Sequence, residues 1–109
     1  MGFNILTIPP FDKQLKRLAK KYPSIKNDFA TLLDDLTENP NRGSSIGKNC
    51  FKIRLAIKSK GKGKSGGARV ITNFAVIHES VYLLSIYDKS EKENISDQEL
   101  KELLESIPD

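Results

Sequence analysis

A segment near the middle of the chain alternates strictly between apolar and other residues, and this feature constrains the fold most. Within residues 51–58, the first, third, fifth and seventh positions are Phe, Ile, Leu and Ile. Successive side chains of a strand point to opposite faces, so this spacing predicts a strand with one face in the core. The opposite face is cationic, because its basic residues are Lys52, Arg54 and Lys58.

The cations of this face have no acidic neighbours in the sequence. Residues 39–78 contain nine Lys and Arg side chains but no Asp or Glu. Arg69 opens the next predicted strand, and hairpin pairing would return it to the side of Arg54. Cations held together repel one another unless an anion lies among them. Two guanidiniums and a lysine on one face favour a phosphate site, whereas a solvated outer face is the simpler alternative.

Length and charge distribution narrow the class of protein. The 109 residues predict one domain, residues 1–109, able to form a core without a disulfide or metal. Residues 1–90 carry a net charge of +9 and residues 91–109 carry −5, so the basic body favours a polyanionic partner. Cys50 is the only cysteine, and we expect no metal site and no cofactor. The N-terminus lacks a signal or membrane-spanning pattern, which predicts a soluble, cytoplasmic protein.

Apolar periodicity and turn residues predict an α+β fold of order β-α-α-β-β-β-α. Two amphipathic helices separated by Pro23 should form an antiparallel hairpin, and a capping box at residues 96–99 begins a short C-terminal helix. Residues 39–49, rich in turn formers, are expected to be a connection. The predicted strands are residues 3–8, 51–58, 68–77 and 81–89.

The segment between the second and third predicted strands, residues 59–67, contains four glycines and three lysines. We expect it to be mobile and exposed. A strand follows it rather than a helix, which argues against a nucleotide-binding P-loop. Its lysines and others near the cationic strand are predicted to bind RNA. These candidate RNA-binding residues are Lys48, Lys58, Lys60, Lys62 and Lys64.

The element order and three sequence segments resemble the RelE/ParE toxin superfamily, especially its HigB-like ribonuclease branch. The segments are KIR at residues 52–54, the Gly-rich segment with Arg69, and the strand exit at residues 87–90. The resemblance implies a small curved, antiparallel-rich sheet of about four strands. The N-terminal helical hairpin would cover one face of the sheet, and the other face would hold the RNA site.

The resemblance also implies a function: the toxin of a type II toxin–antitoxin system that cleaves mRNA on the ribosome without a metal. A cognate, DNA-binding antitoxin, encoded next to it, would be the inhibitory partner. Lys52 and Arg54 match the family's basic pair, Arg69 matches the arginine that opens the third strand, and Lys89 follows the fourth. Nothing aromatic follows Tyr87, which is the nearest substitute for the family's C-terminal tyrosine.

The chemistry of RNA cleavage by its own 2′-hydroxyl suits these residues. The reaction needs a base, charge stabilisation at the phosphate and an acid for the leaving 5′-oxygen. Lys52, crowded by Arg54 and Arg69, is the expected base. The two arginines would hold the phosphate, and Lys89 or Tyr87 would be the acid.

Two other functions are compatible with the sequence. A ParE-like toxin would inhibit DNA gyrase by binding and would cut no RNA, but it needs no phosphate site at Lys52, Arg54 and Arg69. A single-strand-binding module would present more aromatic side chains for base stacking than this chain contains.

Overall fold

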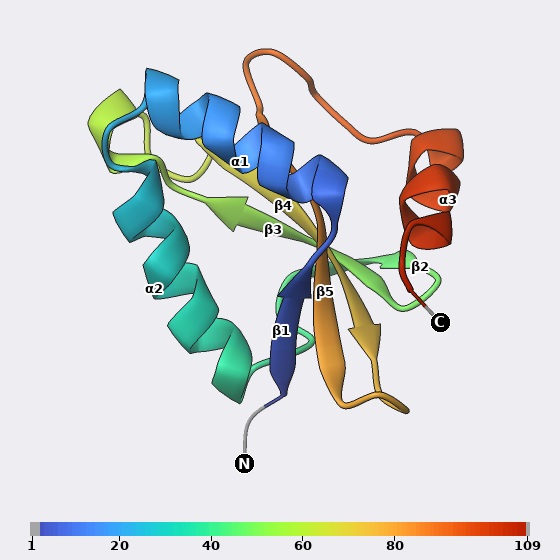
Figure 1. Ribbon diagram of the computed structural model, residues 1–109. Helices are drawn as coiled ribbons and strands as arrows, with labels where there is room; N and C mark the ends of the chain where they lie inside the picture. Colours follow the sequence, from blue (N-terminus) through green and yellow to red (C-terminus); the bar gives the residue numbers. More distant parts are fainter. Residues whose placement is uncertain (1–2, 109) are drawn as a thin grey trace.

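The computed structural model describes residues 3–108, which form three α-helices and a five-stranded sheet (Figure 1). Residues 1, 2 and 109, which the prediction of one domain also covers, lie outside this range. In chain order the elements are β1 (Asn4–Thr7), α1 (Pro9–Lys21), α2 (Ile25–Glu38), β2 (Ser44–Gly47), β3 (Cys50–Leu55), a 3₁₀ turn η1 (Lys58–Lys60), β4 (Ala68–Ala75), β5 (Ser80–Asp88) and α3 (Asp97–Glu105).

The sheet has the strand order β1-β5-β4-β3-β2, which confirms the predicted antiparallel-rich α+β fold. Only β1 runs parallel to its neighbour, β5, and the three other pairs are antiparallel. A parallel pair requires a long crossover, and the two N-terminal helices belong to it. All nine residues of β5 are buried, as expected for an apolar strand with a neighbour on each side.

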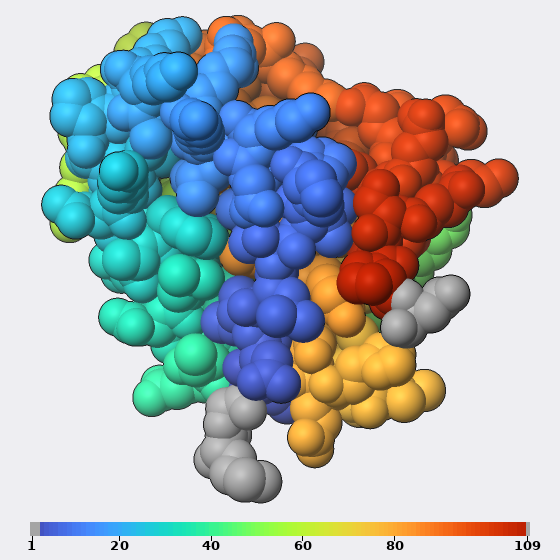
Figure 2. Space-filling view, in the orientation of Figure 1, coloured from blue at the N-terminus to red at the C-terminus, as the bar shows by residue number. Residues whose placement is uncertain are grey.

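The helices pack with their apolar faces toward the core, as the spacing of their apolar residues predicts. The apolar residues of α1 and α2 are buried against the sheet, among them Phe11, Leu18, Leu32 and Leu36. Figure 2 shows α1 next to α2, with α3 on the opposite side of α1. The predicted capping box of α3 is present, because Ser96 and Glu99 each accept a backbone N–H of the other. No helix of residues 3–108 is long and apolar enough to span a membrane.

One strand was missed: residues 44–47, predicted as part of a connection, form β2. Gly47 pairs with Cys50, so the β2–β3 hairpin has a two-residue loop. Both loop residues, Lys48 and Asn49, have positive φ angles of 56° and 59°. This is the geometry of a type I′ turn, which fits the twist of the strands it joins. The asparagine before the alternating strand was therefore a hairpin signal.

Each predicted strand ends later than the observed one, and two of them by more than one residue. β3 ends at Leu55 rather than residue 58, although Ile57 remains buried, and the chain then turns into η1. β4 ends at Ala75 rather than residue 77, and Ile77 is 93% exposed in the turn that follows. In both places apolar alternation continues past the last paired residue, so the sequence alone does not mark where the hydrogen bonds end.

Candidate active site

Three of the predicted site residues lie in one row across the sheet. Arg54 on β3 is directly opposite Arg69 on β4, which in turn is opposite Tyr87 on β5. Directly paired residues share a face of the sheet. Lys52 lies on this face too, two residues along β3, or about 7 Å at the usual strand rise. The predicted grouping of Lys52, Arg54 and Arg69 is therefore confirmed by the strand register.

Arg54 is the open cation of the row. Its side chain is exposed and makes no hydrogen bond or ion pair within residues 3–108. It lines two hollows that lie on either side of it. One, of about 580 Å³, lies along β2 and β3 and includes Lys52 and the hydroxyl-bearing Ser44 and Ser45. The other, of about 400 Å³, lies between β3 and α2.

Arg69, in contrast to Arg54, is buried and only 3% exposed. Its guanidinium donates to the backbone carbonyls of Lys64 at 2.9 Å, Ala68 at 3.1 Å and Ser65 at 3.3 Å. Burial, followed by the nearby charge of Arg54, lowers the pKa of Arg69. Arg69 thus fixes the end of the Gly-rich loop and adds positive charge beside Arg54, instead of standing open to solvent as the sequence suggested.

The C-terminal segment covers part of the face that was expected to be open. Lys52 Nζ donates to the side chain of Asn94 at 3.3 Å, and the Lys92 ammonium lies 5.6 Å from the centre of the Tyr87 ring. Lys92 also forms an ion pair with Glu99 at the start of α3. Tyr87 is only 7% exposed, and burial raises the pKa of its hydroxyl. The row is therefore accessible at Arg54 and closed at Tyr87.

The predicted RNA-binding lysines do not form one group. Lys48 lies at the tip of the β2–β3 hairpin, Lys58 begins η1, and Lys62 and Lys64 lie in the Gly-rich loop, all four exposed. Lys60 differs: its side chain is 10% exposed and its ammonium lies 2.6 Å from the carboxylate of Asp88. The expectation that the whole loop is exposed is therefore wrong at Lys60. Lys89, the other candidate acid, is half-buried directly after β5.

Asp88 is a buried charge that the sequence analysis did not identify. Its carboxylate accepts hydrogen bonds from the Tyr22 hydroxyl at 2.5 Å, Lys60 Nζ at 2.6 Å, and the hydroxyl and N–H of Ser90 at 2.8 and 2.9 Å. Burial by itself would raise the pKa of Asp88, but the bonds from Lys60, Tyr22 and Ser90 outweigh it and hold the pKa far below its usual range. An acid at the end of an apolar strand was the available signal.

Within residues 3–108, no three His, Cys, Asp or Glu side chains gather as metal ligands would.

A comparison with protein families identifies the family of this chain. Residues 11–107 match the family model described as the RelE toxin of the RelE/RelB toxin–antitoxin system. The chain belongs to the RelE toxin family. Members of this family are toxins of toxin–antitoxin pairs, so membership implies an antitoxin partner.

Two solved structures share the RelE fold. A mutant of the Escherichia coli toxin RelE in the free state is 16% identical, with a TM-score of 0.63 over 99% of this chain and 100% of that one. The isolated E. coli RelE toxin is 15% identical, with a TM-score of 0.63 over 96% of this chain and 99% of that one. At such identities the likeness concerns the fold, and the roles of individual residues rest on their own geometry.

Proposed function

We propose that this toxin, acting as a single domain of residues 1–109, is a ribosome-dependent mRNA endoribonuclease that needs no metal. The observation that carries the proposal is the row of Arg54, Arg69 and Tyr87 with Lys52 two residues away. This row supplies positive charge for a phosphate and groups that can exchange protons with its neighbouring oxygens. Assignment to the HigB-like branch stays a prediction.

The reaction divides among the residues as follows. Lys52 accepts the proton of the 2′-hydroxyl, and the 2′-oxygen attacks the adjacent phosphorus. Arg54 binds the phosphate oxygens, where charge builds up in the transition state. The bond from phosphorus to the 5′-oxygen breaks, and this oxygen takes a proton from Tyr87 or Lys89. The products are a 2′,3′-cyclic phosphate and a 5′-hydroxyl.

The geometry of the row supports the proposed dependence on the ribosome. Arg54 alone is open, whereas Tyr87 lies under the C-terminal segment and Lys52 donates to Asn94. Tyr87 meets a substrate only after this segment moves. Substrate held by the ribosome would offset the cost of that movement and of aligning the 2′-oxygen, a contribution that orientation supplies in many enzymes.

The antitoxin partner is proposed to act at the same place. An acidic segment of the antitoxin would complement the exposed charge of Arg54, Lys62 and Lys64. We also propose that the antitoxin binds DNA and is encoded next to the toxin. A crystal structure of the pair tests the binding position of the antitoxin. An antitoxin bound only to the outer side of α1 and α2 would contradict the proposal that it covers the cationic face.

The nuclease is tested by primer extension on mRNA from a translation reaction, with naked mRNA alongside. We expect new ends with translated mRNA and far fewer with naked RNA. End analysis should give 2′,3′-cyclic phosphates and 5′-hydroxyls. Inhibition of gyrase supercoiling with no new RNA ends would overturn the proposal in favour of a ParE-like function.

A further inference from the structure

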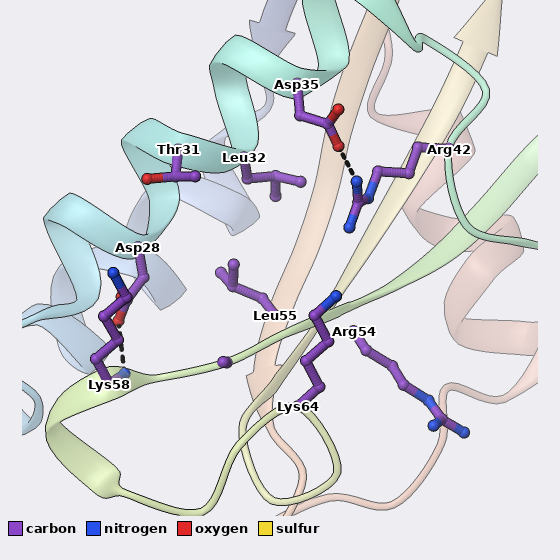
Figure 3. A pocket seen from close by; sticks show the side chains of 10 residues that line it. Asp28, Thr31, Leu32, Asp35, Arg42, Arg54, Leu55, Lys58 and Lys64 are labelled. Atoms are coloured by element: carbon purple, nitrogen blue, oxygen red, sulfur yellow. Dashed lines mark hydrogen bonds and ion pairs between the residues drawn. The ribbon is translucent and has the colours of Figure 1, made fainter.

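The hollow between α2 and β3, here called the α2–β3 pocket, has a volume of about 400 Å³, within the range of small-ligand sites (Figure 3). It opens beside the end of β3 that β2 does not cover, because β2 pairs only with residues 50–52. Apolar side chains contribute to its lining, Leu32 from α2 and Leu55 and Ala56 from β3 and the residue after it. A flat, partly apolar group of the size of a nucleobase has both space and contact there.

A buried carboxylate lies in this pocket. Asp28 is 4% exposed, and its Oδ2 accepts hydrogen bonds from the Ser24 hydroxyl at 2.7 Å and the Lys58 N–H at 3.1 Å. No donor within residues 3–108 reaches Oδ1, and no cation pairs with this carboxylate. Oδ1 also remains accessible: within residues 3–108, the side-chain polar atoms that are both buried and without a partner are Thr72 Oγ1 and the Tyr87 hydroxyl, and Oδ1 is not among them. An ionised carboxylate only accepts hydrogen bonds, so Oδ1 calls for a ligand that donates one.

The rim of the pocket is cationic. Arg42, Arg54 and Lys64 line it, and Figure 3 shows the side chains of Arg42 and Lys64 directed toward its centre. Arg42 is paired with Asp35 on α2, whereas Arg54 has no partner within the described residues. The site therefore offers positive charge outside and an acceptor inside, the reverse of what an acidic ligand group would need at the bottom of the pocket.

Arg54 and Arg42 belong to both hollows, since they also line the hollow along β2 and β3 that contains Lys52. A strand of RNA whose phosphate binds Arg54 therefore has the proposed reacting groups on one side and the α2–β3 pocket on the other.

We propose that the α2–β3 pocket receives the base of a nucleotide adjoining the cleaved phosphate, and that it selects a base with an exocyclic amino group. The N6 group of adenine, N4 of cytosine or N2 of guanine would donate to Asp28 Oδ1. Uracil carries carbonyl oxygens instead of an exocyclic amino group, and its ring N3–H lies between two of them, so the carboxylate meets a repelling oxygen on either side of that donor. This inference rests on the proposed nuclease function and adds a base preference to it.

The pocket is tested without cleavage by NMR titration with the four nucleoside monophosphates. Shifts of the Asp28, Thr31 and Ala56 amides should follow addition of AMP, CMP or GMP and be at least several-fold smaller with UMP. Thr31→Phe fills the pocket from an exposed position and should abolish the shifts. Thr37→Phe is the matched control, because Thr37 is also exposed on α2 but does not line the pocket. Equal shifts with UMP, or shifts that survive Thr31→Phe, would overturn the proposal.

The second test maps cleavage sites on a translated mRNA library. In the wild type, uracil should be depleted at one position next to the cut. Asp28→Asn keeps the shape and an acceptor for Ser24 and Lys58 but turns an N–H₂ toward the base, so the depletion should fall by about tenfold, the effect of one charged hydrogen bond. If wild-type RNA is cut but Asp28→Asn and Thr31→Phe leave the base distribution unchanged, the pocket proposal is wrong and the nuclease proposal stands. If no RNA is cut while the NMR shifts appear, the nuclease proposal is wrong, and base binding in the pocket stands.

Discussion

Tyr87 and Asp88 are neighbours on β5 and both are buried, but they differ in how far their polar atoms are hydrogen-bonded within residues 3–108. The carboxylate of Asp88 points to the side of α1 and receives four hydrogen bonds from three residues. The hydroxyl of Tyr87 points to the other face and has no partner among the described residues. Burial raises the pKa of Tyr87, while hydrogen bonds keep the pKa of Asp88 far below its usual range.

We expect this difference to separate residues that stabilise the sheet from residues that serve the proposed function. Buried polar groups without partners are rare in native proteins because each one costs free energy. On the Asp88 side the cost is offset by Lys60 and Tyr22, which tie η1 and the end of α1 to β5. On the Tyr87 side two guanidiniums and an unpartnered hydroxyl stand in one row. Conflicts of this kind concentrate at functional sites.

Asp88→Ala should have the largest effect on stability. It leaves the Lys60 ammonium, 10% exposed, and the Tyr22 hydroxyl without their acceptor. Breaking a buried ion pair in this way costs about 3–5 kcal/mol of unfolding free energy. Urea unfolding measures it, with Asp34→Ala, an exposed acid on α2, as control. A decrease of less than about 1 kcal/mol would show that the Asp88 cluster does not stabilise the fold.

Arg54→Ala should lower single-turnover cleavage on saturating ribosomes by roughly 10², because the transition-state phosphate loses its open cation. Its unfolding free energy should change by less than about 0.5 kcal/mol, since Arg54 is exposed and unpaired within residues 3–108. Arg69→Ala is the contrasting variant: three carbonyls lose the hydrogen bonds from its guanidinium, so stability falls with activity. If Arg54→Ala cleaves at the wild-type rate, the assignment of the row to the active site is wrong.

Tyr87→Phe should separate the two roles on β5. Removal of an unpartnered buried hydroxyl should leave the unfolding free energy unchanged or raise it by up to about 1 kcal/mol. Cleavage should fall by roughly tenfold, less than the 10² to 10⁴ of a positioned acid, because Lys89 lies two residues further along. Loss of stability with unchanged cleavage would assign Tyr87 to the core.

The acid dependence of stability should trace to Asp88. Its pKa in the folded chain lies below the unfolded value of about 3.9, so its contribution is complete above that pH and declines as the pH falls toward the folded pKa. Urea midpoints measured from pH 6 down to pH 2 should therefore fall below about pH 4 in the wild type. The fall should be shallower in Asp88→Asn, and equal slopes would contradict this assignment.

The smallest effect is expected from the two exposed loop lysines. Replacing Lys62 and Lys64 by Ala should weaken ribosome binding. It should also lower the slope of log binding constant against log salt concentration by about 0.7 to 0.9 for each phosphate that the loop no longer neutralises. Cleavage at saturating ribosome should stay within a few-fold of the wild type. Lys60→Ala is the comparison, because Lys60 is paired with Asp88 and should affect stability instead of the salt dependence. Binding at several salt concentrations measures both.

Local sequence patterns predicted the parts of this structure that depend on neighbouring residues. Alternation predicted β3 and its buried face, and hairpin pairing placed Arg69 beside Arg54. Helical spacing predicted α1 and α2, and the capping box marked the start of α3. Each of these features is decided within a few residues or by one short hairpin.

Contacts between distant segments were beyond such patterns. The pairs Lys60–Asp88 and Lys52–Asn94 join residues far apart in the chain. The sequence shows each of these lysines only as a member of a cationic stretch. Whether an ammonium is open to solvent or already paired depends on where η1 and the C-terminal segment pack, and no periodicity records that.

The parallel pairing of β1 with β5 bears on the synthesis of the chain. Asn4 pairs with Ser80, so β1 is complete before any residue of β5 has been translated. At roughly 5–20 residues per second, β1 waits on the order of 4–15 s for β5. Pairing across such a separation is also slow in itself. The strand that completes the sheet is the one that carries Tyr87, so a nascent chain lacks the full row until β5 has been translated.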